Sequence, residues 1–265
     1  MAETLNPSKT DPSPRANVLG VGVSALNLEE AVWTVVQALA HKTKGYICVT
    51  GVHGITEAQT DPAFRQILNQ AFLNTPDGVP TVWMGRWQGF RHMGRVYGPD
   101  LMLRVCELSP ARGLTHFFYG GGPGVAEELQ RCLQGRFPGL KIVGTFSPPF
   151  RPLTGAEESQ LVSLVARLNP DVFWVGLSTP KQEKFMAQYW MKLDATLFLG
   201  VGAAFDFHTG RVRQAPLWMQ RNGLEWLFRL GCEPRRLWKR YLKNNPLFVG
   251  RAFLQLTGLR KYRIE

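Results

Sequence analysis

The chain has 265 residues, of which 45% are hydrophobic and 19% charged, so it can bury a substantial core and is not disordered as a whole. No apolar run reaches 18 residues, which excludes a membrane-spanning helix. The formal net charge is +11, and it is unevenly distributed. Residues 211–265 hold 13 of the 31 basic residues but only 3 of the 20 acidic ones, so the first 210 residues are nearly neutral.

These differences in composition predict three segments. Residues 1–16 are polar and proline-bearing, and we expect a disordered tail there. Residues 17–210 are expected to form an α/β core, and residues 211–265 a basic, helical appendage. The four cysteines show no CxxC spacing and have apolar neighbours, which favours reduced core thiols in a cytoplasmic protein.

Short apolar runs alternate along the chain with segments of helical periodicity. The predicted strands are 17–23, 46–49, 71–73, 114–119, 140–145, 172–175 and 196–199. The predicted helices are 28–41, 62–70, 80–87, 126–132, 155–168 and 180–193. Residues 27–30 are predicted to cap the first of these, and Thr154 to cap the helix 155–168 with Glu157 at the capping-box position. This alternation indicates an α/β fold with a doubly wound, mostly parallel, Rossmann-like sheet.

The segment 169–185 shows how such a sheet can build a binding site. The strand 172–175 is wholly apolar, and Gly176 begins a tight exit from it. Thr179 is predicted to cap the next helix, with Gln182 at the capping-box position. The helix N-terminus then lies at the carboxyl edge of the sheet, where anions bind.

Glycine-rich loops follow three of the predicted strands, at 120–124, 176–180 and 200–202. Glycines let backbone N–H groups approach a phosphate, although tight turns also use glycine. Three such loops at one sheet edge favour a nucleotide site. The dinucleotide fingerprint and the Walker lysine motif are absent from the sequence, so we expect the nucleotide to act as a carrier.

Asp77 is the candidate general base. It lies in a Pro-Asp-Gly sequence, which is equally typical of a simple turn. The turn directly follows the predicted strand 71–73, which places a lone carboxylate at the same sheet edge. There it could remove a proton from a hydroxyl nucleophile.

The sequence predicts no metal site. The five histidines do not cluster, and Asp206 with His208 is the nearest approach to a ligand pair. Without a metal, a departing diphosphate would need arginines and helix N-termini. The candidates in the core are Arg86, Arg91 and Arg95.

The appendage contains a cationic amphipathic segment at 235–243. Its basic side chains fall within an arc of about 140° at 100° per residue, and they are Arg235, Arg236, Lys239, Arg240 and Lys243. The opposite arc is apolar and aromatic, with Leu237, Trp238, Tyr241 and Leu242. This pattern favours a helix on an anionic membrane surface; the alternative is a helix packed on the core with a solvated basic face.

Several motifs, in order, resemble the WecG/TagA/CpsF glycosyltransferases. They lie at 75–78, 95–101, 119–126, 137–144, 175–183, 200–207, 215–221 and 233–241. The resemblance implies transfer of a sugar, N-acetylmannosamine-like or another hexose, from a UDP-sugar donor to a polyprenyl-diphosphate-linked acceptor. It implies inversion without a metal or cofactor, at the inner face of the plasma membrane, in teichoic acid, capsule or exopolysaccharide synthesis.

The same resemblance implies roles for individual residues. Asp77 would be the base, Thr50 and Gln182 would contact donor or acceptor, and Asp206 lies in a further substrate-binding motif. Arg95 and the loop of Gly120 and Gly121 would bind the nucleotide diphosphate. In the appendage, the residues expected at the acceptor diphosphate are Arg229, Arg236 and Lys239.

Two other classes of function remain open from the residues alone. One is a nucleotide-dependent oxidoreductase, which would need a fuller glycine fingerprint and a ribose-binding acid. The other is a basic-tailed nucleic-acid-binding α/β protein, for which binding would be salt-sensitive. The expected partners are the sugar donor, the lipid acceptor and a membrane surface, not nucleic acid; a homo-oligomer is compatible with the sequence.

Overall fold

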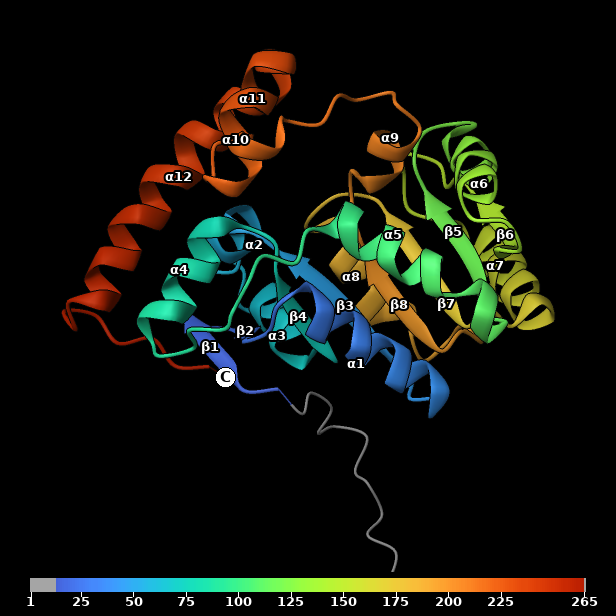
Figure 1. Cartoon of the computed structure of the whole chain (residues 1–265), viewed down its shortest axis with the longest axis horizontal. Helices are drawn as coiled ribbons and strands as arrows, with labels where there is room; N and C mark the ends of the chain where they lie inside the picture. The colour runs from blue at the N-terminus through green and yellow to red at the C-terminus, as the bar shows by residue number, and fades with distance from the viewer. Residues whose placement is uncertain (1–12, 265) are drawn as a thin grey trace, which may run out of the picture.

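The computed structural model describes residues 13–264, apart from the side chain of Arg236. Its centre is a parallel sheet with the strand order β4-β3-β8-β7-β5-β6 (Figure 1). The strands are β3 (Gly45–Thr50), β4 (Leu73–Pro76), β5 (Thr115–Gly120), β6 (Lys141–Phe146), β7 (Val172–Gly176) and β8 (Leu197–Gly200). The predicted α/β, Rossmann-like fold is confirmed.

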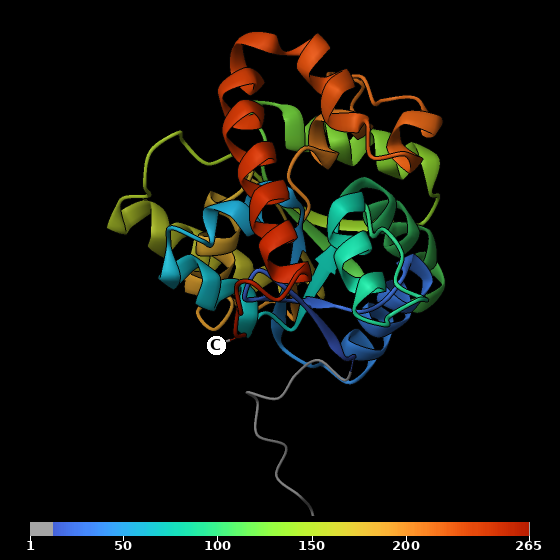
Figure 2. The ribbon, with the colours of Figure 1, turned by 90° about the vertical axis from the view of Figure 1, so that its left-hand side faces the viewer.

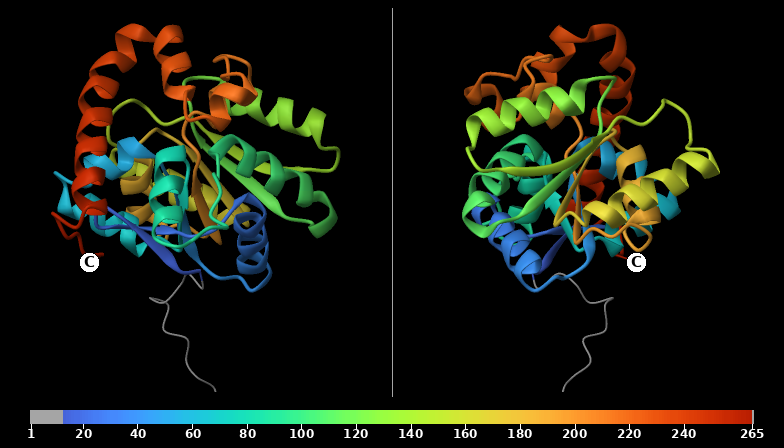
Figure 3. Two further views of the ribbon diagram at one scale, coloured as in Figure 1. Left: turned by 60° about the vertical axis from the view of Figure 1, so that its left-hand side comes forward. Right: turned by 90° about the vertical axis from the view of Figure 1, so that its right-hand side faces the viewer.

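Helices cover both faces of the sheet (Figure 3). Those of the first 210 residues are α1 (Leu28–Ala40), α2 (Val52–Glu57), α3 (Pro62–Gln70), α4 (Val79–Trp87), α5 (Gly98–Leu108), the 3₁₀ turn η1 (Pro110–Arg112), α6 (Val125–Arg136), α7 (Gly155–Leu168), α8 (Lys181–Tyr189) and α9 (Ala204–His208). Alternate strand residues face opposite cores: Phe173 packs with helices α3, α7 and α8, whereas Trp174 packs with α1, α5 and α6. Burial on both faces explains why these strands are continuously apolar.

The expected strand 17–23 is wrong in detail. The segment forms an antiparallel hairpin outside the main sheet, with β1 (Arg15–Val18) paired to β2 (Val21–Ser24). Leu19 and Gly20 form the turn with φ values of 54° and 83°, and this left-handed geometry suits a two-residue hairpin turn. Residues 1–12 of the expected disordered tail lie outside the described residues, while Arg15 and Ala16 belong to β1.

The predicted helix caps have mixed outcomes. The capping boxes of α1, at Asn27 and Glu30, and of α7, at Thr154 and Glu157, are present. The box predicted at Thr179 and Gln182 is wrong, because α8 begins after Pro180 without a side-chain cap. Both side chains instead donate to Oε1 of Glu183, at 2.8 and 3.1 Å.

The expectation that all four cysteines are core thiols is also only partly correct. Cys48 and Cys106 are buried, whereas Cys132 and Cys232 are exposed, and all four are free thiols. The exposed pair lies on the outer faces of α6 and α11, where apolar neighbours in sequence do not imply burial in a helix.

The appendage consists of α10 (Leu217–Arg221), α11 (Glu225–Cys232) and α12 (Pro234–Leu256). Figure 2 shows α12 running down over the core, between α2 and α4. Phe248 and Ala252 of α12 are buried in the core, and Gln255 accepts a hydrogen bond from the backbone N–H of Leu19 at 2.9 Å. The second half of α12 is therefore part of the core packing.

Candidate functional site

A groove of about 1000 Å³ opens at the carboxyl ends of β3 and β4. The core contributes the loop after β3, the turn after β4 and helix α4, while the appendage contributes α11 and α12. Two segments more than 100 residues apart thus form opposite walls of one cavity. Ligands of parallel α/β sheets bind at this edge.

Asp77 lies at the base of this groove, in the turn between β4 and α4. Its backbone N–H donates to the carbonyl oxygen of Thr50, which fixes the turn against β3. Its side chain is 32% exposed, and its Oδ1 atom is buried without a hydrogen-bond partner in the described structure. The predicted turn therefore does place a carboxylate at the sheet edge.

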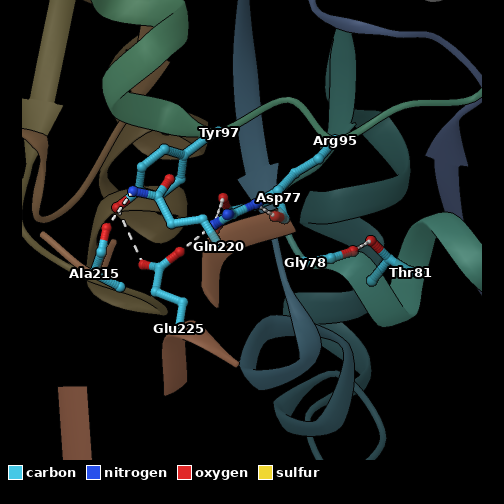
Figure 4. Close-up of polar contacts among 8 residues, drawn as sticks. All are labelled: Asp77, Gly78, Thr81, Arg95, Tyr97, Ala215, Gln220 and Glu225. Atoms are coloured by element: carbon cyan, nitrogen blue, oxygen red, sulfur yellow. Dashed lines mark hydrogen bonds and ion pairs between the residues drawn. The ribbon is translucent and has the colours of Figure 1, made fainter. Parts of the chain in front are cut away.

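Arg95 and Glu225 form an ion-paired network around Asp77 (Figure 4). The Nε atom of Arg95 donates to the carbonyl oxygen of Asp77, and its Nη2 lies 3.5 Å from Asp77 Oδ1. The same Nη2 donates to Oε2 of Glu225 at 2.5 Å. Tyr97 donates its hydroxyl to Oε1 of Glu225 at 3.1 Å, and its ring lies 4.1 Å from the Arg95 guanidinium.

This environment raises the pKa of Asp77 to about 6. Burial is the main cause, and the Glu225 carboxylate adds to it, whereas the guanidinium groups of Arg95 and Arg229 act in the opposite direction. A carboxylate with a pKa near 6 is still ionised at pH 7.5. It is also a stronger base than an ordinary aspartate, as a general base requires.

Arginines of both walls make part of the groove cationic, with Arg86 and Arg95 from the core and two more from the appendage. Arg229 and Arg240 line it, and the Nε of Arg229 is buried without a hydrogen-bond partner among the described residues. The helical pattern had assigned Arg240 to the membrane-facing arc; the structure places it in the groove. Lys239 is exposed and does not line the groove, and the side chain of Arg236 lies outside the described residues.

A further stretch of the groove is apolar. Trp83 and Trp87 of α4 line it opposite Val249 and Phe253 of α12. These four side chains are 58 to 74% exposed, which is unusual for a cluster of large apolar side chains in a folded protein. The groove thus joins a charged region to an apolar one.

Thr50 and Gln182 do not line the groove. Both are buried, at 3% and 2% exposure, and Thr50 Oγ1 and Gln182 Oε1 have no hydrogen-bond partner in the described structure. The neighbouring Glu183 is buried as well, and burial raises its pKa. Unsatisfied buried polar atoms are rare in folded proteins, so these side chains are candidates for contact with a polar ligand.

Gly120, Gly121 and Asp206 lie further along the same edge, outside the groove lining. Gly120 has a φ of 130°, and a Cβ atom there would lie 2.6 Å from the carbonyl oxygen of Gly176. Close strand approach therefore requires this glycine whether or not a phosphate binds. Asp206 lies half-buried in α9.

Sequence reasoning missed Glu225, Tyr97 and Arg240 as site residues. Glu225 had a detectable signal, since it is one of only three acids in a segment with 13 basic residues. Tyr97 had none, because nothing local marks a tyrosine that contacts a helix 128 residues away.

Residues 13–264 contain no group of three or more histidine, cysteine, aspartate or glutamate side chains placed to hold a metal ion. In the same residues, no helix combines the length and apolar character needed to cross a membrane.

Known proteins that are similar in sequence to this chain match most of its length. The chain is 32% identical over 183 residues to an N-acetylglucosaminyldiphosphoundecaprenol N-acetyl-beta-D-mannosaminyltransferase of Bacillus subtilis (strain 168), covering 69% of each chain. It is 30% identical over 209 residues to the enzyme of the same name from Bacillus spizizenii, covering 78% of this chain and 79% of the relative. The model of the glycosyl transferase WecG/TagA/CpsF family matches residues 16–262, so the groove, its core wall and the appendage are all included. The chain belongs to the glycosyl transferase WecG/TagA/CpsF family.

Proposed function

We propose that the protein transfers an N-acetylmannosamine-like sugar from a UDP-sugar to an acceptor sugar linked through a diphosphate to a polyprenol. The single observation that carries this proposal is the composition of the groove. One continuous cavity contains a basic carboxylate, four arginines and an apolar wall. A ligand matching it has a hydroxyl, an anionic group and a hydrocarbon chain.

The groove residues can be matched to the parts of such an acceptor. Arg229 and Arg240 would bind the diphosphate, since guanidinium groups hold phosphate oxygens with directed, charge-assisted hydrogen bonds. The first prenyl units would lie along Trp83, Trp87 and Phe253, which removes their exposed surface from water. The names of both relatives specify an acceptor of this type, with a sugar, a diphosphate and a polyprenyl chain.

The proposed reaction is a single displacement at the anomeric carbon. Asp77 accepts the proton of the acceptor hydroxyl as its oxygen forms a bond to that carbon. The bond from the anomeric carbon to the UDP oxygen breaks at the same time, and UDP leaves with the electron pair. Attack from the opposite face inverts the configuration.

The donor would occupy the adjacent part of the sheet edge. Thr50 and Gln182 carry unsatisfied polar atoms, and the loop at Gly120 and Gly121 lies at the same edge. Arginines and helix N-termini are proposed to stabilise the leaving diphosphate without a metal. A lipid acceptor further requires the protein to work at a membrane surface, and the exposed basic face of α12 suits the inner, anionic leaflet.

An assay with matched acceptors tests the proposal. Purified protein is given UDP-N-acetylmannosamine and an N-acetylglucosamine diphosphate that carries either a prenyl tail or a methyl group. We expect transfer to the prenyl compound, weak transfer to the methyl compound, and none to N-acetylglucosamine without a diphosphate. Equal transfer to all three would contradict the assignment of the groove.

A further inference from the structure

Glu225 is an acidic residue at the first position of α11, in the otherwise basic appendage. Its side chain is 12% exposed and spans the boundary between appendage and core. Oε2 accepts from Arg95 and Oε1 accepts from Tyr97, so both carboxylate oxygens are held by core residues (Figure 4). A partly buried, doubly hydrogen-bonded ion pair fixes geometry far better than an exposed one.

Arg229 lies one helical turn after Glu225 on the same helix, and residues four apart lie on one helix face. Holding Glu225 against Arg95 therefore also fixes where Arg229 enters the groove. The Arg229 guanidinium lies 5.6 Å from the ring of Phe207, a core residue, and its Nε is buried. The position of α11 thus determines whether Arg229 reaches the groove.

We propose that Glu225 is a positioning residue that docks α11 onto the core through Arg95 and Tyr97 and so completes the acceptor site beside Asp77. The expected change in acceptor binding rests on the proposed function, whereas the docking of α11 onto the core does not. In the undocked state the core keeps Asp77, while Arg229 is withdrawn from it. Only molecules with α11 docked bind the acceptor. Loss of the contact between Glu225 and Arg95 lowers the docked fraction, and the apparent affinity falls in proportion to it.

The test uses the full-length protein and the variant Glu225→Gln. The matched control is Glu128→Gln, which breaks the exposed ion pair of 2.7 Å between Glu128 and Arg211 without touching the groove. Hydrogen exchange of α11 is measured first and needs no substrate. Faster exchange in Glu225→Gln, but not in Glu128→Gln, supports docking; identical exchange in both overturns it.

Kinetics provide the second measurement. Glu225→Gln is expected to raise KM for the lipid acceptor about tenfold to a hundredfold, the range for losing a hydrogen-bonded ion pair, with a smaller change in kcat. Tyr97→Phe, which removes only the hydrogen bond to Oε1, should change KM in the same direction but less. An unchanged KM in both variants contradicts the positioning role even where α11 exchange is altered.

The pH profile separates positioning at Asp77 from a general effect on folding. The charged groups facing Asp77 are Arg95, Glu225 and Arg229, and Arg86 and Arg240 also line the groove. Removing the negative charge of Glu225 lowers the pKa of Asp77, so the acidic limb of kcat/KM should move to lower pH. An acidic limb that stays at the same pH would refute the proposed link between Glu225 and the base.

If neither the wild-type protein nor any variant transfers sugar, the proposed function fails while the hydrogen-exchange result stands.

Discussion

Replacing Asp77 with asparagine is expected to raise the stability of the fold while it removes most of the activity. The pKa of Asp77 is about 6 in the folded protein against an ordinary value of 3.8. The folded state therefore binds the proton more tightly than the unfolded chain, and ionisation of Asp77 destabilises the fold above pH 6. This cost shrinks as the pH falls from 6 towards 3.8 and is absent below that range.

The magnitude follows from the pKa difference. About two pH units at 1.36 kcal/mol each would give about 3 kcal/mol. Because the Asp77 side chain is 32% exposed, solvent screening reduces this to about 1–2 kcal/mol. Asparagine has nearly the same shape and carries no charge, so Asp77→Asn should gain that amount at pH 7.5. For a chain of this size the melting temperature should rise by about 2–8 °C.

Two assays on the same preparation check this reasoning. Thermal unfolding at pH 7.5 and pH 4 should show a higher melting temperature for Asp77→Asn at pH 7.5 and a much smaller difference at pH 4. Sugar transfer at pH 7.5 should fall by about two to four orders of magnitude, the range for a positioned base. A variant that melts lower at pH 7.5, or turns over like wild type, would refute a buried catalytic carboxylate at this position.

Three other outcomes follow from the groove and its surroundings. Trp87→Ala should raise KM for a prenyl acceptor about tenfold, from about 1–2 kcal/mol of lost apolar contact, and leave a tail-less analogue unaffected. Replacing Trp33, which is also largely exposed but lies on α1 outside the groove, is the control, and equal effects of the two changes would contradict a lipid subsite. Replacing Arg235, Lys239 and Lys243 by glutamate should abolish co-sedimentation with anionic vesicles, since each basic residue near the membrane surface contributes about 1 kcal/mol. The same variant should still transfer sugar to a soluble acceptor. Continued sedimentation would assign membrane binding to another surface. Turnover should survive EDTA, because arginines are proposed to stabilise the leaving group, and rescue of chelated enzyme by a divalent ion would disprove that.

Much of the fold could be predicted from the sequence because its signals are local. The run 172–175 and the capping boxes at Asn27 and Thr154 each depend on a few adjacent residues, and the structure contains all of them. The hairpin at β1 and β2 was missed because the largely apolar segment 17–23 resembles a single strand. In the structure, the positive φ values of Leu19 and Gly20 turn the chain back and separate β1 from β2.

The candidate site was less predictable because it depends on contacts between distant segments. Asp77 could be identified from its turn and the resemblance, and the structure places it in the groove with Arg95 and Arg229. The helical pattern gave Arg240 and Lys239 the same basic arc, yet only Arg240 lines the groove. The spacing of residues along a helix shows which side chains share a face. Which face packs inward depends on the elements that the helix contacts, and for α12 these are α2 and the core.

The contacts between the N-terminal hairpin and the last helix also affect how the protein is made. Asn17 donates to the carbonyl oxygen of Tyr262 at 2.8 Å, across 245 residues, and Leu19 donates to Gln255. At about 5–20 residues per second, a ribosome adds the later partners roughly 10–50 s after the hairpin has been synthesised. During that interval the groove has only its core wall, so Trp83 and Trp87 lack the α12 residues that line the groove with them. The nascent chain therefore cannot complete the proposed acceptor site until translation is nearly finished.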